Sequence, residues 1–414
     1  MRLRFGTSGL RAVMGEDKDC INLRVIRKIT LGVAAYAKKI AREPSVAISY
    51  DTRNNSEQFA KETARILAME GCIVFIYPVP TPTPLLSFAV RELKCHLGIC
   101  ITANHDPKEY NGYKVYGEDG CLITDRIARI IHEEISCADT DSIREWESFE
   151  IFVKERKIVY ISERINEAYL KEIRKLRFDQ ESLDALKIVY TSLNGTGLFP
   201  VLETLGMLGI RNVTLVEEQI EMNGEFPTCT CPSTEEDEVL ALGISMCKRI
   251  NADILLATDP ACDRIGVVAK QGKEYVRLSG SQLGLLLLEY VLKMRKYYGT
   301  LPEKPVVIKT IATTSTVDKI AEEYGTQVIT TLTGFKYIGE QIGKLEKAGE
   351  LKRFVFALEE GCGYLAGSYV RDMDGIGIAA LVCEMVGYYK RQGKTLWKQL
   401  DILYKRYECY SSML

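Results

Sequence analysis

The sequence predicts an α/β protein built from several consecutive domains. Short apolar segments alternate with amphipathic segments along nearly the whole chain, and strands that alternate with helices form parallel or mixed sheets with helices on both faces. The chain has 414 residues, of which 46% are hydrophobic and 27% are charged. This composition is ordinary for a globular protein, and at about 100–200 residues per domain the length holds two to four domains.

The alternation of strands and helices can be followed from one end of the chain to the other. The apolar segments are rich in Val, Ile and Leu, and the segments after them repeat their apolar residues with helical spacing. Strands are predicted at 46–50, 73–77, 97–101, 188–191, 254–257, 306–308 and 354–358, and helices at 57–70, after Gly197, at 315–324 and at 375–392.

Two stretches separate these α/β units. Residues 138–156 are rich in charged side chains, and residues 292–304 combine Lys, Arg, Gly and Pro. Charged and turn-forming residues gather in the segments between domains. We therefore predict three domains, at residues 1–150, 151–295 and 296–414.

Charge and cysteine content bear on partners and location. The net charge of −2 gives no basic field for nucleic acid or anionic lipid. No apolar run approaches the ~20 residues that span a bilayer, and the N-terminal segment lacks the apolar region of a signal peptide. The 13 cysteines are scattered, and the pair Cys229 and Cys231 lacks the second pair of a zinc site. We expect a cytoplasmic protein with buried, reduced thiols, and neither nucleic acid nor a membrane as partner.

Four polar or glycine-rich loops adjoin apolar strands, which is where ligands bind in open α/β sheets. The first runs from Phe5 to Arg11. Its glycines allow close backbone approach, and Arg11 can hold an anion; an ordinary turn with a surface arginine explains the loop equally well.

The second loop follows the predicted strand 97–101 and carries Asn104, His105 and Asp106, with Lys114 further along. The chain has three histidines, and His105 is the one that lies in a polar loop. A single histidine is more often structural than catalytic, but these neighbours favour a site.

The third loop carries two carboxylates, Asp259 and Asp263, directly after the predicted strand 254–257. Carboxylates at a strand end suit Mg²⁺, which takes oxygen ligands. Two carboxylates alone make a weak site, and a capped turn with a surface pair of Asp263 and Arg264 is the alternative.

The fourth loop carries two adjacent glutamates, Glu359 and Glu360, and is followed by Arg371. Carboxylates at a strand end accept hydrogen bonds from vicinal sugar hydroxyls, and a guanidinium matches the geometry of phosphate oxygens. A solvated charged loop is the alternative.

Taken together and in this order, the four loops resemble those of the α-D-phosphohexomutases, the family of phosphoglucomutase and phosphomannomutase. The resemblance covers nearly the whole chain and is strongest to the branch of the larger bacterial phosphoglucomutases. Further matches are Tyr50-Asp-Thr-Arg53, Pro80-Thr-Pro-Thr-Pro84, Thr333-Gly-Phe-Lys336 and residues 363–374. The resemblance implies three consecutive mixed-sheet domains of the phosphohexomutase type. We expect the family's fourth, C-terminal domain to be missing, because no counterpart of its phosphate loop precedes Leu414.

The resemblance also implies a mechanism. In the family a serine carries a phosphate, Mg²⁺ bridges that phosphate to three aspartates, and a Glu-x-Ser motif holds sugar hydroxyls. His105 and Lys114 match the positions that the family offers for proton transfer. The implied substrate-binding positions are Arg11, Arg264, Glu359, Glu360, Gly361 and Arg371.

The departures from the family pattern fall on this apparatus. Asn104 stands where the phosphorylated serine belongs, Ala261 replaces the middle metal aspartate, and Gly361 replaces the sugar-binding serine. Asn194 stands where the closest branch usually has histidine. A carboxamide has no hydroxyl to phosphorylate, and Mg²⁺ would be left with Asp259 and Asp263 alone, so its binding is expected to be weak.

We therefore expect a phosphohexomutase-like protein that has lost phosphoserine-dependent activity. It would bind a hexose phosphate, or act as a regulatory subunit, as a homo-oligomer or paired with an intact mutase. The alternative is an active mutase that interconverts hexose 1- and 6-phosphates by another route or with a partner domain. A second alternative is a truncated, decaying paralogue.

Overall fold

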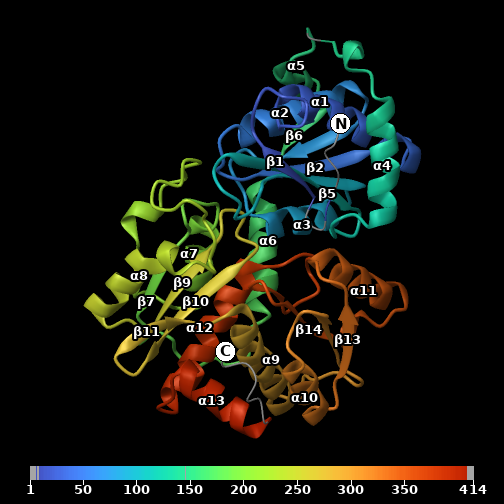
Figure 1. Ribbon diagram of the computed structural model, residues 1–414. Coiled ribbons are helices and arrows are strands. Elements are labelled where there is room, and N and C mark those ends of the chain that lie inside the picture. The colour runs from blue at the N-terminus through green and yellow to red at the C-terminus, as the bar shows by residue number, and fades with distance from the viewer. Residues whose placement is uncertain (1–5, 7–8, 145, 408–414) are drawn as a thin grey trace.

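The computed structural model describes residues 6, 9–144 and 146–407, and it confirms an α/β fold with three mixed sheets (Figure 1). The domain of the first sheet lies at the top of Figure 1, and the other two lie side by side beneath it. Phe5, Thr7 and Ser8 of the first predicted loop lie outside the described residues, as do residues 408–414.

The first sheet has the strand order β1-β5-β4-β2-β3-β6. β4, β2, β3 and β6 are parallel, whereas β5 is antiparallel to β4 and β1. Alternate residues of β2 serve opposite faces: Ile48 packs in the core under α1 and α2, and Ala47 packs in the smaller core under α3. The elements are β1 (Leu10–Val13), α1 (Leu23–Ile40), β2 (Ser45–Tyr50), α2 (Ser56–Met69), β3 (Ile73–Ile76), α3 (Thr83–Glu92), β4 (Leu97–Ile101), β5 (Tyr110–Gly117), α4 (Asp125–Cys137), α5 (Phe149–Lys154) and β6 (Ile158–Tyr160).

The second sheet has the order β11-β10-β9-β7-β8. Its strands β9, β7 and β8 are parallel, and β10 runs antiparallel to β9 and β11. The elements are α6 (Glu163–Arg174), β7 (Ile188–Thr191), α7 (Leu198–Met207), β8 (Val213–Leu215), α8 (Asp237–Ile250), β9 (Ile254–Thr258), β10 (Ile265–Gln271) and β11 (Glu274–Arg277).

The third sheet has the order β13-β12-β14-β15, with β15 antiparallel to β14 and the others parallel. β12 and β14 are buried along their whole length, which is typical of strands that helices cover on both faces. The elements are α9 (Gly280–Tyr297), β12 (Val306–Thr310), α10 (Thr316–Glu323), β13 (Gln327–Thr331), α11 (Phe335–Lys347), β14 (Phe354–Glu359), β15 (Gly363–Leu365), α12 (Gly375–Arg391) and α13 (Leu396–Arg406).

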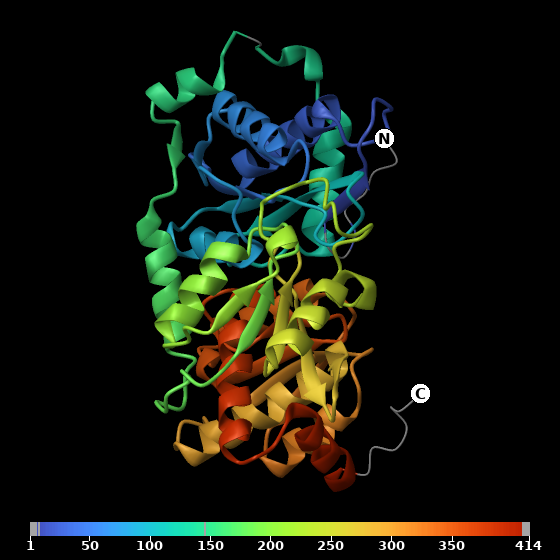
Figure 2. The same ribbon diagram turned by 90° about the vertical axis from the view of Figure 1, so that its left-hand side faces the viewer.

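The sheets divide the chain at other places than the predicted domain boundaries. β6 pairs with β3, so the first sheet receives a strand from beyond residue 150. α9 packs against β14, so the third unit begins before residue 296. Figure 2 shows the chain from α5 through β6 to α6 running down one side of the molecule from the first domain to the second. β6 was missed because it is short and its Val159 and Tyr160 are exposed, which leaves no apolar pattern to recognise.

Within the described residues, no helix is both long and apolar enough to cross a membrane. The cysteines of the described part of the chain are all free, and Cys72, Cys100 and Cys383 are buried as predicted.

A buried carboxylate joins α12 to the segment that leads into the second sheet. Glu384 accepts the backbone N–H groups of Phe178 at 2.9 Å and Asp179 at 2.7 Å, and the hydroxyl of Tyr290 at 3.1 Å. The residue is 2% exposed. Burial raises the pKa of Glu384 to about 7, against the lowering effect of these donors.

Glu384→Gln is therefore expected to flatten the dependence of stability on pH. The raised pKa means that Glu384 favours folding below its unfolded pKa, near 4.5, and that this contribution is lost as pH rises towards 7. Between pH 4.5 and pH 8, the free energy of unfolding of Glu384→Gln should thus rise relative to that of the wild type by on the order of 2–3 kcal/mol. Urea unfolding at several pH values measures this difference, and parallel profiles for the two proteins would contradict it.

Candidate active site

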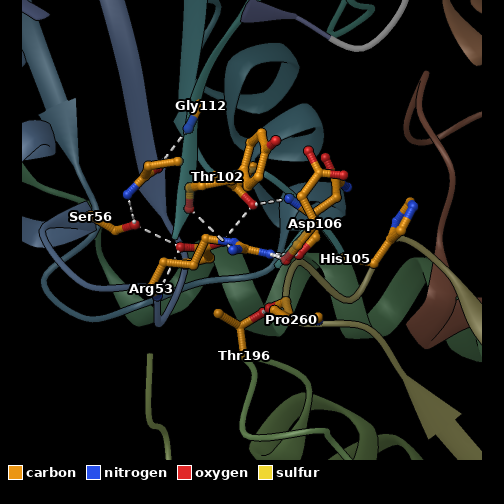
Figure 3. Close-up of polar contacts among 12 residues, drawn as sticks. Arg53, Ser56, Thr102, His105, Asp106, Gly112, Thr196 and Pro260 are labelled. Atoms are coloured by element: carbon orange, nitrogen blue, oxygen red, sulfur yellow. Dashed lines mark hydrogen bonds and ion pairs between the residues drawn. The ribbon is translucent and has the colours of Figure 1, made fainter. Parts of the chain in front are cut away.

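Loops from all three sheets meet at the carboxyl ends of β4, β9 and β14. The loops after β9 and β14 touch through their backbones: Arg264 and Gly363 form an antiparallel bridge, and the Ile265 N–H donates to the Cys362 carbonyl at 3.3 Å. Gly375 adds a further contact, because a Cβ there would lie 2.7 Å from the Cys262 carbonyl oxygen. Figure 3 shows the loop after β4, with Thr102, His105 and Asp106, beside Thr196 and Pro260 of the second domain.

Asn104 lies at the centre of this cluster. Its φ of 55° is left-handed, a conformation that asparagine tolerates better than most residues, and its N–H donates to Thr102 Oγ1 at 2.8 Å. Arg11 Nη2 donates to Asn104 Oδ1 at 2.6 Å, and Asn104 Nδ2 donates to Asp263 Oδ2. The carboxamide therefore joins a cation of the first domain to a carboxylate of the second.

Lys114, on β5, is a fully buried cation beside two aspartates. Its side chain is 1% exposed, and Nζ lies 3.3 Å from Asp263 Oδ2 and 3.8 Å from Asp372 Oδ2. Burial lowers the pKa of Lys114, but the two carboxylates outweigh burial and leave the pKa raised. Lys114 is therefore charged in the folded protein.

Asp259 and Asp263 both lie in the loop after β9, within the cluster around Asn104. Asp259 Oδ1 accepts the N–H groups of Asp263 at 3.1 Å and Arg264 at 3.0 Å. Burial and the like charge of Asp263 raise the pKa of Asp259 to about 7, whereas Lys114 and Arg264 overcome burial and lower the pKa of Asp263.

Each of the two aspartates has one carboxylate oxygen that is available to bind a divalent cation. Asp259 Oδ2 and Asp263 Oδ1 are buried and have no hydrogen-bond partner among the described residues. Carboxylate oxygens of this kind fit Mg²⁺. The site is sparse, because the side chain of Ala261 supplies no oxygen and no group of three or more His, Cys, Asp or Glu is arranged around a metal position within residues 6, 9–144 and 146–407.

His105 is a neutral imidazole beside this cluster. Burial lowers the pKa of His105 to about 3, helped by the charges of Arg264 and Arg11. Its Nδ1 is buried without a hydrogen-bond partner in the described part of the chain. Its backbone carbonyl accepts the thiol of Cys231, from the second domain, at 2.8 Å.

The third domain contributes Glu359, at the end of β14. Arg264 Nη2 lies 3.6 Å from Glu359 Oε1, and burial raises the pKa of Glu359 to about 7 although Arg264 opposes the rise. A Cβ at Gly361 would lie 3.1 Å from Arg264 Nη1, so a serine there would press on the guanidinium. Glu360 accepts the hydroxyl of Thr310 at 2.6 Å.

Arg371 lies apart from this cluster, in the contact between the first and third domains. The residue is fully buried. Its Nη1 donates to backbone carbonyls of its own loop, including Val370 at 3.0 Å, and its Nη2 lies 3.0 Å from Glu346 Oε2 on α11. That Arg371 binds a phosphate stays a prediction: apart from the ion pair with Glu346, its Nε and Nη2 are buried without a hydrogen-bond partner among the described residues.

A small cavity of about 20 Å³ lies among the clustered side chains. Sequence reasoning missed four of the residues that line it. Asp372 lies next to Arg371 in the loop before α12, and its place in that loop beside Asp374 was the only sequence signal for it. Leu122, Phe335 and Met373 also line the cavity, and an apolar residue carries no sequence signal of a site.

Three family models match consecutive parts of the chain. They are described as phosphoglucomutase/phosphomannomutase, alpha/beta/alpha domain I at residues 2–141, domain II at 167–272 and domain III at 279–407. The chain therefore belongs to the phosphoglucomutase/phosphomannomutase family, the α-D-phosphohexomutases, as the four loops indicated.

Individual relatives agree with this assignment. The phosphoglucomutase of Staphylococcus haemolyticus (strain JCSC1435) is 35% identical, over 97% of this chain and 72% of its own length. A putative phosphomannomutase from Thermus thermophilus has the same fold, with a TM-score of 0.82 at 24% identity over 99% of this chain and 84% of that one. The N-acetylphosphoglucosamine mutase of Aspergillus fumigatus, solved in complex with GlcNAc-6P and magnesium, gives a TM-score of 0.57 at 12% identity over 97% and 79%.

Proposed function

We propose that this chain binds a hexose phosphate at the cluster around Asn104 and that it does not carry out transfer through a phosphoserine. The observation that carries the proposal is the Asn104 carboxamide, held between Arg11 and Asp263. The resemblance of the loop motif implies that Asn104 stands where the family has its serine. An amide nitrogen is not a nucleophile of the hydroxyl kind, and phosphoryl transfer through a serine needs that hydroxyl.

Three cations support the binding half of the proposal. Arg11, Lys114 and Arg264 all contact the residues of this cluster, and guanidinium and ammonium groups are the usual partners of phosphate. Glu359 lies beside Arg264 and supplies carboxylate oxygens for sugar hydroxyls. Relatives named phosphoglucomutase and the mutase solved with GlcNAc-6P make a hexose phosphate the ligand of choice.

Mg²⁺ would be held by Asp259 and Asp263, and when bound it would neutralise phosphate charge near Lys114. Adding Mg²⁺ is expected to stabilise the wild type modestly: at tenfold above the dissociation constant, linkage gives about 1.4 kcal/mol. Asp259→Asn should remove the effect, and the exposed control Asp237→Asn should keep it. Thermal unfolding midpoints in a MgCl₂ titration measure the shift, and an equal shift in all three proteins would contradict the assignment.

An active mutase is the second candidate, and the comparisons favour it. The 35% identity to a phosphoglucomutase extends over 97% of this chain, and the motif resemblance implies that Arg11, His105, Lys114 and Glu359 match family positions. Turnover would then need another phosphoryl acceptor or a partner domain. Loss of one member of a catalytic set that acts as a unit reduces rates by several powers of ten, which is why we place this candidate second.

Two measurements on the wild type test the proposal. Calorimetric titration should show that glucose 6-phosphate and glucose 1-phosphate bind, and that glucose binds far more weakly. Arg264→Gln should lower the affinity for both sugar phosphates. A coupled phosphoglucomutase assay at high protein concentration, with Mg²⁺ and glucose 1,6-bisphosphate, should stay at background. Turnover well above background would establish the second candidate, and absence of phosphosugar binding would reject both.

A further inference from the structure

The backbone of the loop around Asn104 is held from behind by one buried arginine. Arg53 follows β2, and its side chain is fully buried. Its Nη1 donates to the carbonyls of Pro107 at 2.8 Å and Tyr110 at 3.1 Å, and its Nη2 donates to the carbonyl of Asn104 at 2.6 Å. Nη2 also donates to the carbonyl of Asp106, so one guanidinium binds three carbonyls of the loop and that of Tyr110 at the start of β5 (Figure 3).

Asp51 fixes the position of this guanidinium. Asp51 Oδ2 lies 3.3 Å from Arg53 Nε and also accepts the hydroxyl of Thr102, whose Oγ1 in turn accepts the N–H of Asn104. Asp51 Oδ1 accepts the hydroxyl of Ser56 at 2.7 Å. A planar fork with several donors suits an array of fixed carbonyls, whereas an ammonium would satisfy fewer of them.

The second domain closes over the other side of Arg53. Phe226 is 1% exposed, and its ring centroid lies 5.2 Å from Arg53 Cζ, within reach of a cation–π contact. Gly224 lies so near that a Cβ there would be 2.4 Å from the Asn54 nitrogen. We call residues 223–231 the second-domain arm.

The same arm holds the loop at two further points. Glu225 accepts Asn54 Nδ2 at 2.6 Å and Lys108 Nζ at 2.9 Å, and Cys231 donates to the His105 carbonyl at 2.8 Å. Lys108 and Glu225 are about half exposed, so that pair adds little stability. The buried contact between Arg53 and Phe226 is therefore the main mechanical link between the arm and the loop.

We propose that Arg53 is a positioning residue for the loop that carries Asn104 and His105, and that Phe226 of the second domain keeps Arg53 in place. The affinity of the site for a phosphorylated sugar then depends on the docking of an arm that does not touch the ligand. This inference rests on the proposed function for its ligand. A displaced loop moves Asn104 and His105 relative to Arg11 and Arg264, and a displacement of about 1 Å is enough to weaken a preorganised site ~10- to 100-fold.

The test compares Phe226→Leu and Arg53→Lys with the wild type, and uses Phe199→Leu and Arg24→Lys as matched controls at exposed positions. Calorimetric titration with glucose 6-phosphate should show affinity at least tenfold weaker in the first two proteins and unchanged in the controls. Hydrogen exchange of the peptide covering residues 103–110 should speed up in the same two proteins. Arg53→Lys keeps the charge of the original side chain and Phe226→Leu keeps its apolar character, so both variants are expected to fold.

The exchange measurement separates this inference from the proposed function, because it needs no ligand. If the wild type does not bind glucose 6-phosphate, the proposed function fails while faster exchange in both variants still supports the positioning role. Unchanged exchange at residues 103–110 in both variants would overturn the inference. Faster exchange with unchanged affinity would overturn it as well, since the loop's position would then not govern binding.

Discussion

Asn104→Ser is expected to take up a phosphoryl group from glucose 1,6-bisphosphate, whereas the wild type is not. The serine hydroxyl would replace an amide at the centre of a cluster that keeps Arg11, Lys114, Asp263 and His105. Serine tolerates the left-handed backbone at this position less well than asparagine, at a cost on the order of 1 kcal/mol. That penalty is small beside the increase in rate, by several powers of ten, that a restored nucleophile supplies.

Intact mass spectrometry after incubation with the bisphosphate measures the added phosphoryl group, and its stability to acid identifies a phosphoserine. Asn104→Ala is the matched control, because it removes the amide without supplying a hydroxyl. The coupled assay should then rise above background in Asn104→Ser alone. An acid-labile adduct on the wild type would point to His105 as acceptor and would favour the second candidate instead.

Lys114→Met is expected to lower the free energy of unfolding by about 3–5 kcal/mol. Methionine fills a similar volume, but it leaves Asp263 and Asp372 buried without the cation that lies within 4 Å of both. Tyr116 and Asn104 still donate to these carboxylates, which keeps the loss from being larger. Chemical denaturation followed by circular dichroism measures the change.

Lys108→Met is the control for this substitution. Lys108 is exposed, and it pairs with an exposed glutamate, Glu225, so its replacement should change stability by less than about 1 kcal/mol. Equal losses for the two variants would show that Lys114 does not carry a buried charge pair.

Strands that are fully buried could be placed from the sequence. β7 begins and ends where its apolar segment does, at Ile188 and Thr191, and β14 differs from the prediction only by Glu359 at its end. A continuous apolar segment bounded by polar residues leaves little freedom for a strand. The exposed β6 offered no such signal, and the sequence does not record that α9 packs on the third sheet.

The sequence predicted which loops form the site, but not the directions in which their side chains point. Asn104, Asp263 and Glu359 were expected together from the family resemblance, although they follow strands of three different sheets, and their partners link them. The direction of a side chain depends on contacts far away in the sequence. Arg371 turns towards Glu346, and Arg53 towards the back of the loop, and both partners lie well away in the sequence although within the same domain.

The backbone bridge between Arg264 and Gly363 has a consequence for how the molecule can move. Because this bridge and the close approach of Gly375 to Cys262 join main chains rather than side chains, the second and third domains cannot swing apart at this edge without breaking them. The first domain is joined to the second by a main-chain hydrogen bond as well, from the Thr83 N–H to the Ala261 carbonyl at 3.0 Å, and to the other two by side chains such as Asn104, Lys114 and Tyr116. The loops that carry Asp263 and Glu359 are therefore expected to keep their relative position when a ligand binds.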